Sequence, residues 1–127
     1  MTIRPLNAND VALYRSLRLA ALEQDATAFG STLERESRFD DATRAARLGS
    51  FQGRPGAVFV ADESGTPVGI AGVGLSADPT VAILWGMWVD PAARRAGIAK
   101  QLLAARFAEA RREGTEIIMT APLEANR

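Results

Sequence analysis

The sequence predicts a single α/β domain over residues 1–127, and three observations predict it. Segments with strand periodicity and with helix periodicity occur in the order strand, helices, three strands, helix, strand. The chain has 127 residues, which is enough for one hydrophobic core but small for an enzyme. It contains no internal repeat, low-complexity tract or interdomain linker. One undivided domain is therefore expected.

The N-terminal part of the chain is predicted to contain one strand and two helices. Thr2 to Pro5 is a short strand candidate. Asn7, with Asp10 three residues later, has the pattern of a helix cap for a segment that reaches about Glu23. A second helix is predicted between Asp40 and Leu48, within a polar stretch.

Three strands are predicted in the middle of the chain, at Ala57 to Asp62, Pro67 to Leu75 and Val81 to Val89. The first two form a hairpin around the turn Glu63-Ser64-Gly65-Thr66. The third is apolar on both faces, which indicates a central strand that is covered on both sides. Strict alternation would divide its residues into one face with Val81, Ile83, Trp85, Met87 and Val89, and another with Ala82, Leu84 and Trp88.

A helix and a strand are predicted at the end of the chain. The helix extends from about Ile98 to Arg112, and Gly114 ends it. Glu116 to Thr120 begins a further strand. The apolar residues of the helix are Leu102, Leu103, Ala105, Phe107 and Ala110.

Charge and composition exclude several classes of function. Fifteen Lys and Arg residues balance fifteen Asp and Glu residues, so no overall basic field favours nucleic acid or an anionic membrane as a partner. The absence of cysteine and histidine excludes disulfides, thiolate nucleophiles, Ser-His-Asp catalysis and metal sites built on those residues. The N-terminus lacks the apolar core of a signal peptide, and no apolar run approaches ~20 residues. We therefore expect a soluble, cytoplasmic protein without a metal site.

The most informative stretch lies between Trp88 and Leu103, where an apolar run ends and a helix begins. The run closes with Val89-Asp90-Pro91, and a loop of mostly small residues, Arg94-Arg95-Ala96-Gly97-Ile98-Ala99, leads into the helix. A helix start has unpaired backbone N–H groups and partial positive charge, so small residues there let a pyrophosphate approach. The two arginines add charge and forked donors. The stretch predicts a phosphate site; the alternative is an ordinary loop with solvated arginines.

Gly69 to Gly74 is a second glycine-rich segment, but its pattern is different. The glycines follow the order G-x-x-G-x-G and interrupt a strand pattern, so the dinucleotide-binding fingerprint is not met. Tight packing or a bulge in a strand is the favoured interpretation.

Two further groups of residues have both a functional and an ordinary interpretation. The acidic residues Glu34, Glu36, Asp40 and Asp41 could attract a cationic amine, but we favour solvated helix ends. Trp85 and Trp88 could line a pocket, but aromatic residues in a buried strand more often belong to the core.

From about Trp85 to Ala105 the chain resembles the GCN5-related N-acetyltransferases, the GNAT superfamily. The matching residues are Met87-Trp88-Val89-Asp90-Pro91, then Arg94-x-x-Gly97-x-Ala99 against the family's Arg/Gln-x-x-Gly-x-Gly/Ala. Ile3-Arg4-Pro5, Arg18-Leu19 and Ala28-Phe29-Gly30 are also similar to many bacterial members. The resemblance implies a mixed, mostly antiparallel sheet flanked by helices. Its fourth and fifth strands, here Val81 to Val89 and Glu116 to Thr120, would splay apart.

The resemblance also implies a cosubstrate and its site. The loop from Arg94 to Ala99, with Lys100 just inside the helix, would hold the pyrophosphate of acetyl-coenzyme A (acetyl-CoA). Main-chain groups of Met87 and Val89 would pair with the pantetheine arm. An acceptor amine would attack the thioester directly, while a backbone N–H near Val89 stabilises the oxyanion. The residues expected to bind the cosubstrate are Met87, Trp88, Val89, Arg94, Arg95, Ala96, Gly97, Ile98, Ala99, Lys100 and Asn126.

The chain departs from the family's pattern where a base and an acid are usual. Ile83 and Leu84 occupy positions where many members carry a glutamate base that acts through water. Many members also carry a tyrosine acid within Asn-x-x-Ala-x-x-x-Tyr; Asn126 would begin that pattern, and the sequence ends at Arg127. Tyr14, the only tyrosine, is expected to pack. No residue is therefore assigned a catalytic role, and the domain is expected to be incomplete at its C-terminus, without the last helix and strands.

The sequence therefore predicts an acetyl-CoA-dependent N-acetyltransferase that acts on a primary amine of a small-molecule or protein acceptor. The alternative is a CoA-binding regulatory or interaction module without turnover, and an unrelated nucleotide-binding domain is a third option. Asp25 to Gly53 should shape the acceptor site, but it carries no specific motif. Ile117, Ile118 and Met119 are expected on an uncovered edge, so self-association through Glu116 to Thr120 into a homodimer is expected as well.

Overall fold

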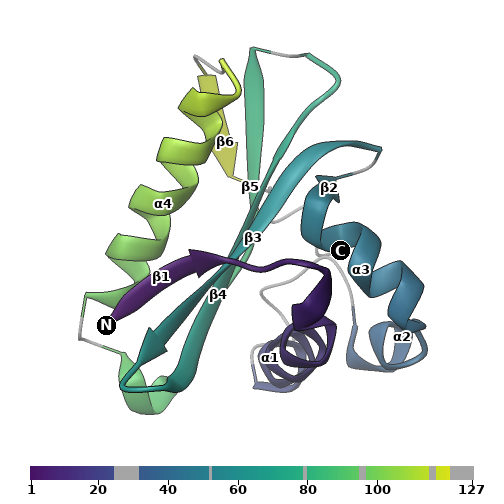
Figure 1. Cartoon of the computed structure of the whole chain (residues 1–127), viewed down its shortest axis with the longest axis vertical. Coiled ribbons are helices and arrows are strands. Elements are labelled where there is room, and N and C mark those ends of the chain that lie inside the picture. Colours follow the sequence, from purple (N-terminus) through teal and green to yellow (C-terminus); the bar gives the residue numbers. More distant parts are fainter. Residues whose placement is uncertain (25–31, 52, 79, 95–96, 115–116, 121–127) are drawn as a thin grey trace.

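The computed structural model describes residues 1–24, 32–51, 53–78, 80–94, 97–114 and 117–120, which form one sheet with helices on both faces (Figure 1). The strands are β1 (Thr2–Pro5), β2 (Ser50–Phe51), β3 (Arg54–Glu63), β4 (Thr66–Leu75), β5 (Val81–Val89) and β6 (Ile117–Thr120). They lie in the order β1-β3-β4-β5-β6, and β2 pairs with β3. Only β6 runs parallel to its neighbour among the described strands. The prediction of a mixed, mostly antiparallel sheet is thus confirmed.

The described residues form the α-helices α1 (Val11–Gln24), α2 (Leu33–Ser37), α3 (Asp41–Gly49) and α4 (Ile98–Arg112), with short 3₁₀ turns at Ala8–Asp10 and Pro91–Ala93. Three of these four α-helices occupy the predicted positions, and the short helix α2 was not predicted. The predicted cap before α1 is confirmed. The Asn9 N–H donates to the Asn7 side chain at 2.8 Å, and the Asn7 N–H donates to the Asp10 carboxylate at 2.9 Å. None of the helices in the described part of the chain combines the length and the apolar character that crossing a bilayer requires.

In Figure 1, α1 and α3 lie on one side of the sheet and α4 on the other. One apolar cluster on each face holds these helices to the sheet. The first joins α1 and α3 to the sheet through Tyr14, Leu17, Ala21, Leu22, Leu48, Val58, Val60, Ile70 and Trp88. The second joins α4 to the opposite face through Ile98, Leu102, Ala110, Phe59, Ala61, Ala71, Val73, Leu84 and Val89. β3, β4 and β5 contribute to both clusters, which makes them the covered centre of the sheet.

A β-bulge interrupts β5 at Gly86. The register with β4 passes from the pair of Gly72 with Trp85 to the pair of Ile70 with Trp88, so β5 contains one more residue than β4 across this step. Gly86 has a φ of +64°, a left-handed conformation that glycine adopts without the strain a Cβ would cause.

The bulge corrects the strict alternation expected for this strand. Trp85 and Trp88 both pack against the α1 cluster, whereas Leu84 and Val89 both belong to the α4 cluster. Trp88 therefore does not share a face with Leu84, and Val89 does not share a face with Trp85. One extra residue reverses the parity of every position that follows it. The interpretation of Trp88 as a core residue is confirmed, and Trp85 is partly buried against the same cluster.

In the described residues, β6 pairs with β5 along only the first half of β5. Their register joins Val81–Leu84 to Ile117–Thr120, and beyond Leu84 no described strand lies on this side of β5. The main chain of Trp85–Val89 on the side of β6, called here the open edge, is therefore without a strand partner in the described residues. β6 is described only as far as Thr120, so the predicted divergence of the two strands beyond this point lies outside the described residues and stays a prediction.

The expectation of solvated helix ends holds for Glu34, Asp40 and Asp41 of the acidic cluster and fails for Glu36. Asp40 fits that expectation, because it caps α3 by accepting from the Thr43 N–H at 2.8 Å. Glu36, by contrast, is only 2% exposed, and its carboxylate accepts two bonds from Arg18 of α1, at 2.9 and 3.0 Å. The expectation fails for Glu36 because a partner on another helix neutralises its charge.

Candidate functional site

The start of α4 is the place where the sequence predicts a phosphate site. Gly97 is its N-cap residue, with a φ of +73°, and no side chain caps the N–H groups of the first turn. Gly97, Ala99 and Lys100 are exposed, whereas Ile98 is buried and anchors the turn to the core. A Cβ built at Gly97 would meet no atom within 4 Å. Unpaired amides at a helix start attract an anion, and the open space at Gly97 would let an anion approach them.

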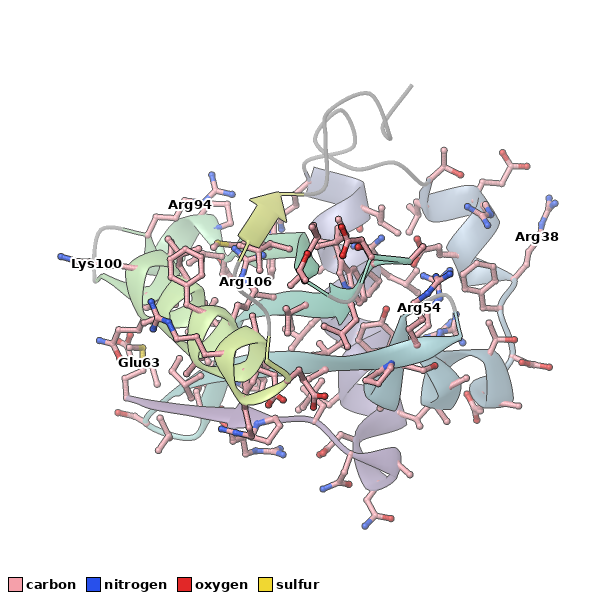
Figure 2. All side chains as sticks on the ribbon, turned by 90° about the horizontal axis from the view of Figure 1, so that it is seen from above. Arg38, Arg54, Glu63, Arg94, Lys100 and Arg106 are labelled. Atoms are coloured by element: carbon pink, nitrogen blue, oxygen red, sulfur yellow. The ribbon has the colours of Figure 1, made fainter. Side chains whose placement is uncertain are left out.

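Two cationic side chains stand at this end of the molecule, Arg94 and Lys100 (Figure 2). Both residues are exposed. Because both are exposed, their charges are accessible to an anion that binds at this end of α4. Arg95, Ala96 and Asn126, which the sequence also predicts as binding residues, lie outside the described residues.

The open edge presents the main chain of Val89 and Met87. The Asp90 N–H donates to the Val68 carbonyl at 2.8 Å, so the main-chain groups of Val89 point away from β4, toward the open edge. Met87, two positions earlier, has the same orientation. Arg94 Nε donates to the Val89 carbonyl at 2.9 Å and thereby links this edge to the start of α4. The intervening Trp88 pairs with β4 instead, and its ring is buried.

The glycine-rich run in β4 serves close packing, as favoured from the sequence. A Cβ at Gly72 would overlap the indole ring of Trp85. A Cβ at Gly69 would lie 3.0 Å from the Trp88 carbonyl and 3.2 Å from Leu102 Cδ1. Only glycine lets the two tryptophans and α4 approach the strand this closely.

Two buried arginines flank the bulge of β5, and neither was predicted as a site residue. From the α1 face, the Arg18 guanidinium lies 5.7 Å from the centroid of the Trp85 ring. Its Nη1 would be 3.1 Å from a Cβ at Gly86. Arg106, from α4, is the second.

Arg106 lies between α4 and the sheet (Figure 2) and is 4% exposed. Its Nη1 donates to the Gly72 carbonyl at 3.3 Å, and its Nη2 lies 3.6 Å from Met87 Sδ. Burial lowers the pKa of Arg106 to about 10, so the group stays charged at neutral pH. A spacing of four residues could have revealed it, since Leu102, Arg106 and Ala110 follow one buried stripe of α4.

The two positions at which a catalytic base would be expected carry no side chain that can accept a proton. Leu84 is buried in the α4 cluster, and Ile83 is apolar too. Tyr14 is 1% exposed within the α1 cluster, and burial raises the pKa of its hydroxyl, which agrees with the expected packing role. Within the described residues, no group of three His, Cys, Asp or Glu side chains is placed to hold a metal ion.

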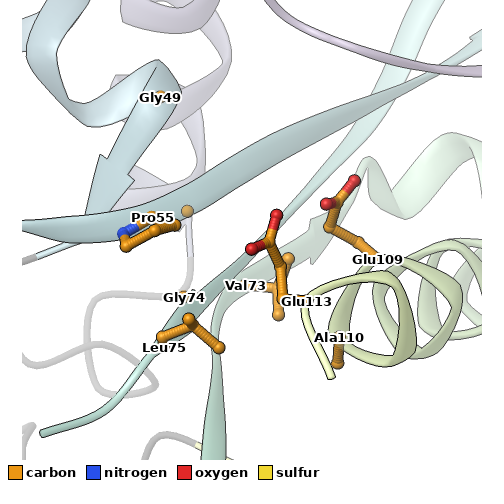
Figure 3. A pocket seen from close by; sticks show the side chains of 9 residues that line it. Gly49, Pro55, Val73, Gly74, Leu75, Glu109, Ala110 and Glu113 are labelled. Carbon is orange, nitrogen blue, oxygen red and sulfur yellow. The ribbon is translucent and has the colours of Figure 1, made fainter. Parts of the chain in front are cut away.

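A separate cavity of about 150 Å³ lies at the far end of α4 (Figure 3). Two carboxylates, those of Glu109 and Glu113, stand at its rim (Figure 3). Its other lining residues are Gly49, Pro55, Gly56, Val73, Gly74, Leu75 and Ala110. Because the 15 residues of α4 span roughly 22 Å, this cavity is remote from Gly97. It does not belong to the predicted phosphate site.

Comparisons with known proteins find a matching family model and similar solved structures. The family model described as the acetyltransferase (GNAT) family matches residues 18–127. Among the curated proteins, none matches the chain. An aminoglycoside acetyltransferase from an uncultured soil metagenomic sample has a similar structure, with a TM-score of 0.75 and 22% identity over 94% of this chain and 77% of that one.

Two further solved structures extend the comparison. A predicted acetyltransferase from Clostridium acetobutylicum, solved with acetyl-CoA, has a TM-score of 0.70 and 18% identity over 99% of this chain and 83% of that one. A ribosomal-protein-alanine N-acetyltransferase from Brucella melitensis has a TM-score of 0.66 and 23% identity over 94% of this chain and 73% of that one. At these identities the structures support a common fold.

Proposed function

The chain belongs to the acetyltransferase (GNAT) family, and on this basis we propose that it transfers the acetyl group of acetyl-CoA to a primary amine of a small molecule or a protein. Members of this family use acetyl-CoA as the acyl donor. The observation that carries the proposal is the uncapped start of α4 beside the open edge of β5. An anion site next to unpaired strand groups suits a pyrophosphate followed by an amide-bearing arm.

In this proposal, each part of the site has one task. The first-turn amides from Gly97 to Lys100 and the side chain of Arg94 hold the pyrophosphate, together with Arg95 and Ala96. The main chain of Met87 and Val89 pairs with the pantetheine arm and aligns the thioester for the acceptor amine. The buried side chains of Trp88 and Ile98 fix the backbone on either side. Asn126 remains in the proposed set from the resemblance alone.

Two measurements test this function. Calorimetry with CoA and acetyl-CoA measures the affinity of the site, and competition by ATP and NAD measures its selectivity. Release of free thiol from acetyl-CoA in the presence of a panel of amines measures transfer. Binding with thiol release supports the transferase, whereas displacement of CoA by ATP or NAD at equal concentration would contradict it.

A second candidate is a CoA-binding module without turnover. The observation that favours it is the apolar character of Ile83 and Leu84, where a base would be expected. CoA binding without thiol release for every amine tested would support this candidate.

The acceptor is proposed as an amine without further assignment. Among the similar structures are enzymes named for aminoglycosides and for the alanine of a ribosomal protein. An aminoglycoside and a peptide with an N-terminal alanine therefore belong in the amine panel. Self-association through β6, an edge strand of the described sheet, stays a prediction.

Arg94→Ala is expected to weaken binding of CoA by about 1 to 3 kcal/mol, because charge-assisted hydrogen bonds to the pyrophosphate are lost. The loss should shrink as the salt concentration rises, since salt screens exposed charges. Calorimetry at low and high salt measures both effects. Arg38→Ala is the matched control: this exposed arginine stands on the opposite side of the molecule (Figure 2) and should leave the affinity unchanged.

The rate of transfer is expected to rise with pH and to follow the pKa of the acceptor amine. Only the deprotonated amine attacks the thioester, and no side-chain base is assigned to remove its proton. Below the amine pKa, the rate should therefore increase about tenfold for each pH unit. Profiles for two acceptors of different basicity should be displaced by the difference in their pKa values. A plateau well below the amine pKa would point to a base in the protein.

A further inference from the structure

Arg106 carries a buried charge that no described group neutralises. On the other face of the bulge, Glu36 neutralises Arg18 through two hydrogen bonds. Arg106 has no carboxylate partner among the described residues, and its Nε is buried without a hydrogen bond. Burial without a counter-charge lowers the pKa of Arg106 only to about 10, so the positive charge persists at neutral pH. Such a charge costs stability unless something compensates it.

The fold itself gives little reason for this charge. Within the described residues, the polar contacts of Arg106 are one long hydrogen bond, at 3.3 Å, to the Gly72 carbonyl and one approach to Met87 Sδ at 3.6 Å. A neutral side chain of similar length could fill the same space, and a neutral donor could serve the same carbonyl. The positive charge of Arg106, in contrast to its volume, therefore calls for a partner other than the described residues.

Met87 connects Arg106 to the proposed cosubstrate. Its sulfur contacts the guanidinium, while its main chain faces the open edge where the pantetheine arm would pair. Negative charge that develops on the arm would therefore form close to an unscreened cation in a poorly solvated environment. Electrostatic stabilisation is strongest under those conditions.

We propose that the charge of Arg106 stabilises the thiolate of CoA as it leaves the acetyl group. The inference rests on the proposed transferase function. In the transfer, the amine nitrogen forms a bond to the acyl carbon, the carbon–sulfur bond breaks, and its electron pair remains on sulfur. The nitrogen loses its proton to water. Arg106 stabilises the negative charge on sulfur and donates no proton. Other members of the family use a tyrosine for the leaving sulfur, and that tyrosine acts as an acid.

Titration of the thiol of bound CoA tests the proposal without turnover. The ultraviolet absorbance of the thiolate is followed against pH below ~9, where Arg106 stays charged, and a complex with desulfo-CoA supplies the background. In the wild type, the thiol pKa is expected to lie about one unit or more below that of free CoA. Arg106→Met and Arg106→Gln should both return it to the free value. Each should also lower kcat roughly tenfold per unit of pKa lost.

Two comparisons separate charge from structure. Arg106→Gln keeps a donor for the Gly72 carbonyl but removes the charge, so a thiol pKa that stays low in this variant would overturn the proposal. Arg111→Gln removes an exposed arginine from the same helix and should change neither the thiol pKa nor kcat. A thiol that titrates like free CoA in the wild type would overturn the proposal as well. Absence of CoA binding in calorimetry would instead refute the proposed function itself.

Discussion

Glu36→Ala is expected to lower the free energy of unfolding by about 3 to 5 kcal/mol. The carboxylate of Glu36 is buried and accepts two hydrogen bonds from Arg18, which is itself buried beneath α1. Removal of the carboxylate leaves the Arg18 cation desolvated and without its counter-charge. That is far more costly than loss of an ion pair in water. Chemical denaturation monitored by circular dichroism measures the change.

Glu34→Ala is the matched control for this prediction. Glu34 belongs to the same short helix and accepts from Arg38 at 3.0 Å, but both side chains are largely exposed. Its removal should have almost no effect on the free energy of unfolding. Similar small losses in the two variants would mean that the Arg18–Glu36 pair is solvated in solution.

Gly97→Val is expected to weaken binding of CoA by about 2 kcal/mol or more, which is roughly 30-fold in Kd. The Cβ position of Gly97 is open in the protein alone, so the valine would occupy the space through which a phosphate reaches the first-turn amides. The left-handed φ of +73° adds backbone strain that lowers stability by about 1 kcal/mol. Calorimetry on the folded variant measures the loss of affinity.

Gly114→Val separates backbone strain from obstruction of the site. Gly114 has a φ of +82°, its Cβ position is equally open, and it lies at the opposite end of α4. The variant should lose comparable stability and keep its affinity for CoA. Unchanged affinity in a folded Gly97→Val protein would remove the start of α4 from the binding site.

Most of the architecture could be predicted from the sequence, because periodicity and capping act locally. The helix α4 begins and ends at the predicted residues, Ile98 and Arg112, and the cap at Asn7 has the predicted geometry. The bulge at Gly86 could not be predicted in this way. An apolar strand such as Val81–Val89 has no polar residue whose position would reveal a change of parity.

The site was predicted less completely than the fold, for a different physical reason. Gly97 and Arg94 belong to a local motif, which predicts an anion site because it lies between the end of a strand and the start of a helix. Glu36 and Arg106 owe their roles to burial, which depends on packing between distant segments. Single-sequence patterns assign charged residues to the solvent, so a buried one is found only where its spacing coincides with an apolar stripe, as in α4.

The extra residue in β5 makes the length of this strand as important as its composition. Deletion of Gly86 would restore unbroken alternation, and every residue after it would exchange faces. The Trp88 ring would then turn toward α4, where Leu102 already fills the space, and Val89 would turn its main chain away from the open edge. Substitutions in this strand change one contact at a time, whereas loss of one residue would disturb the core and the cosubstrate site together. In related chains, insertions and deletions should therefore be rarer between Leu84 and Val89 than changes of residue type.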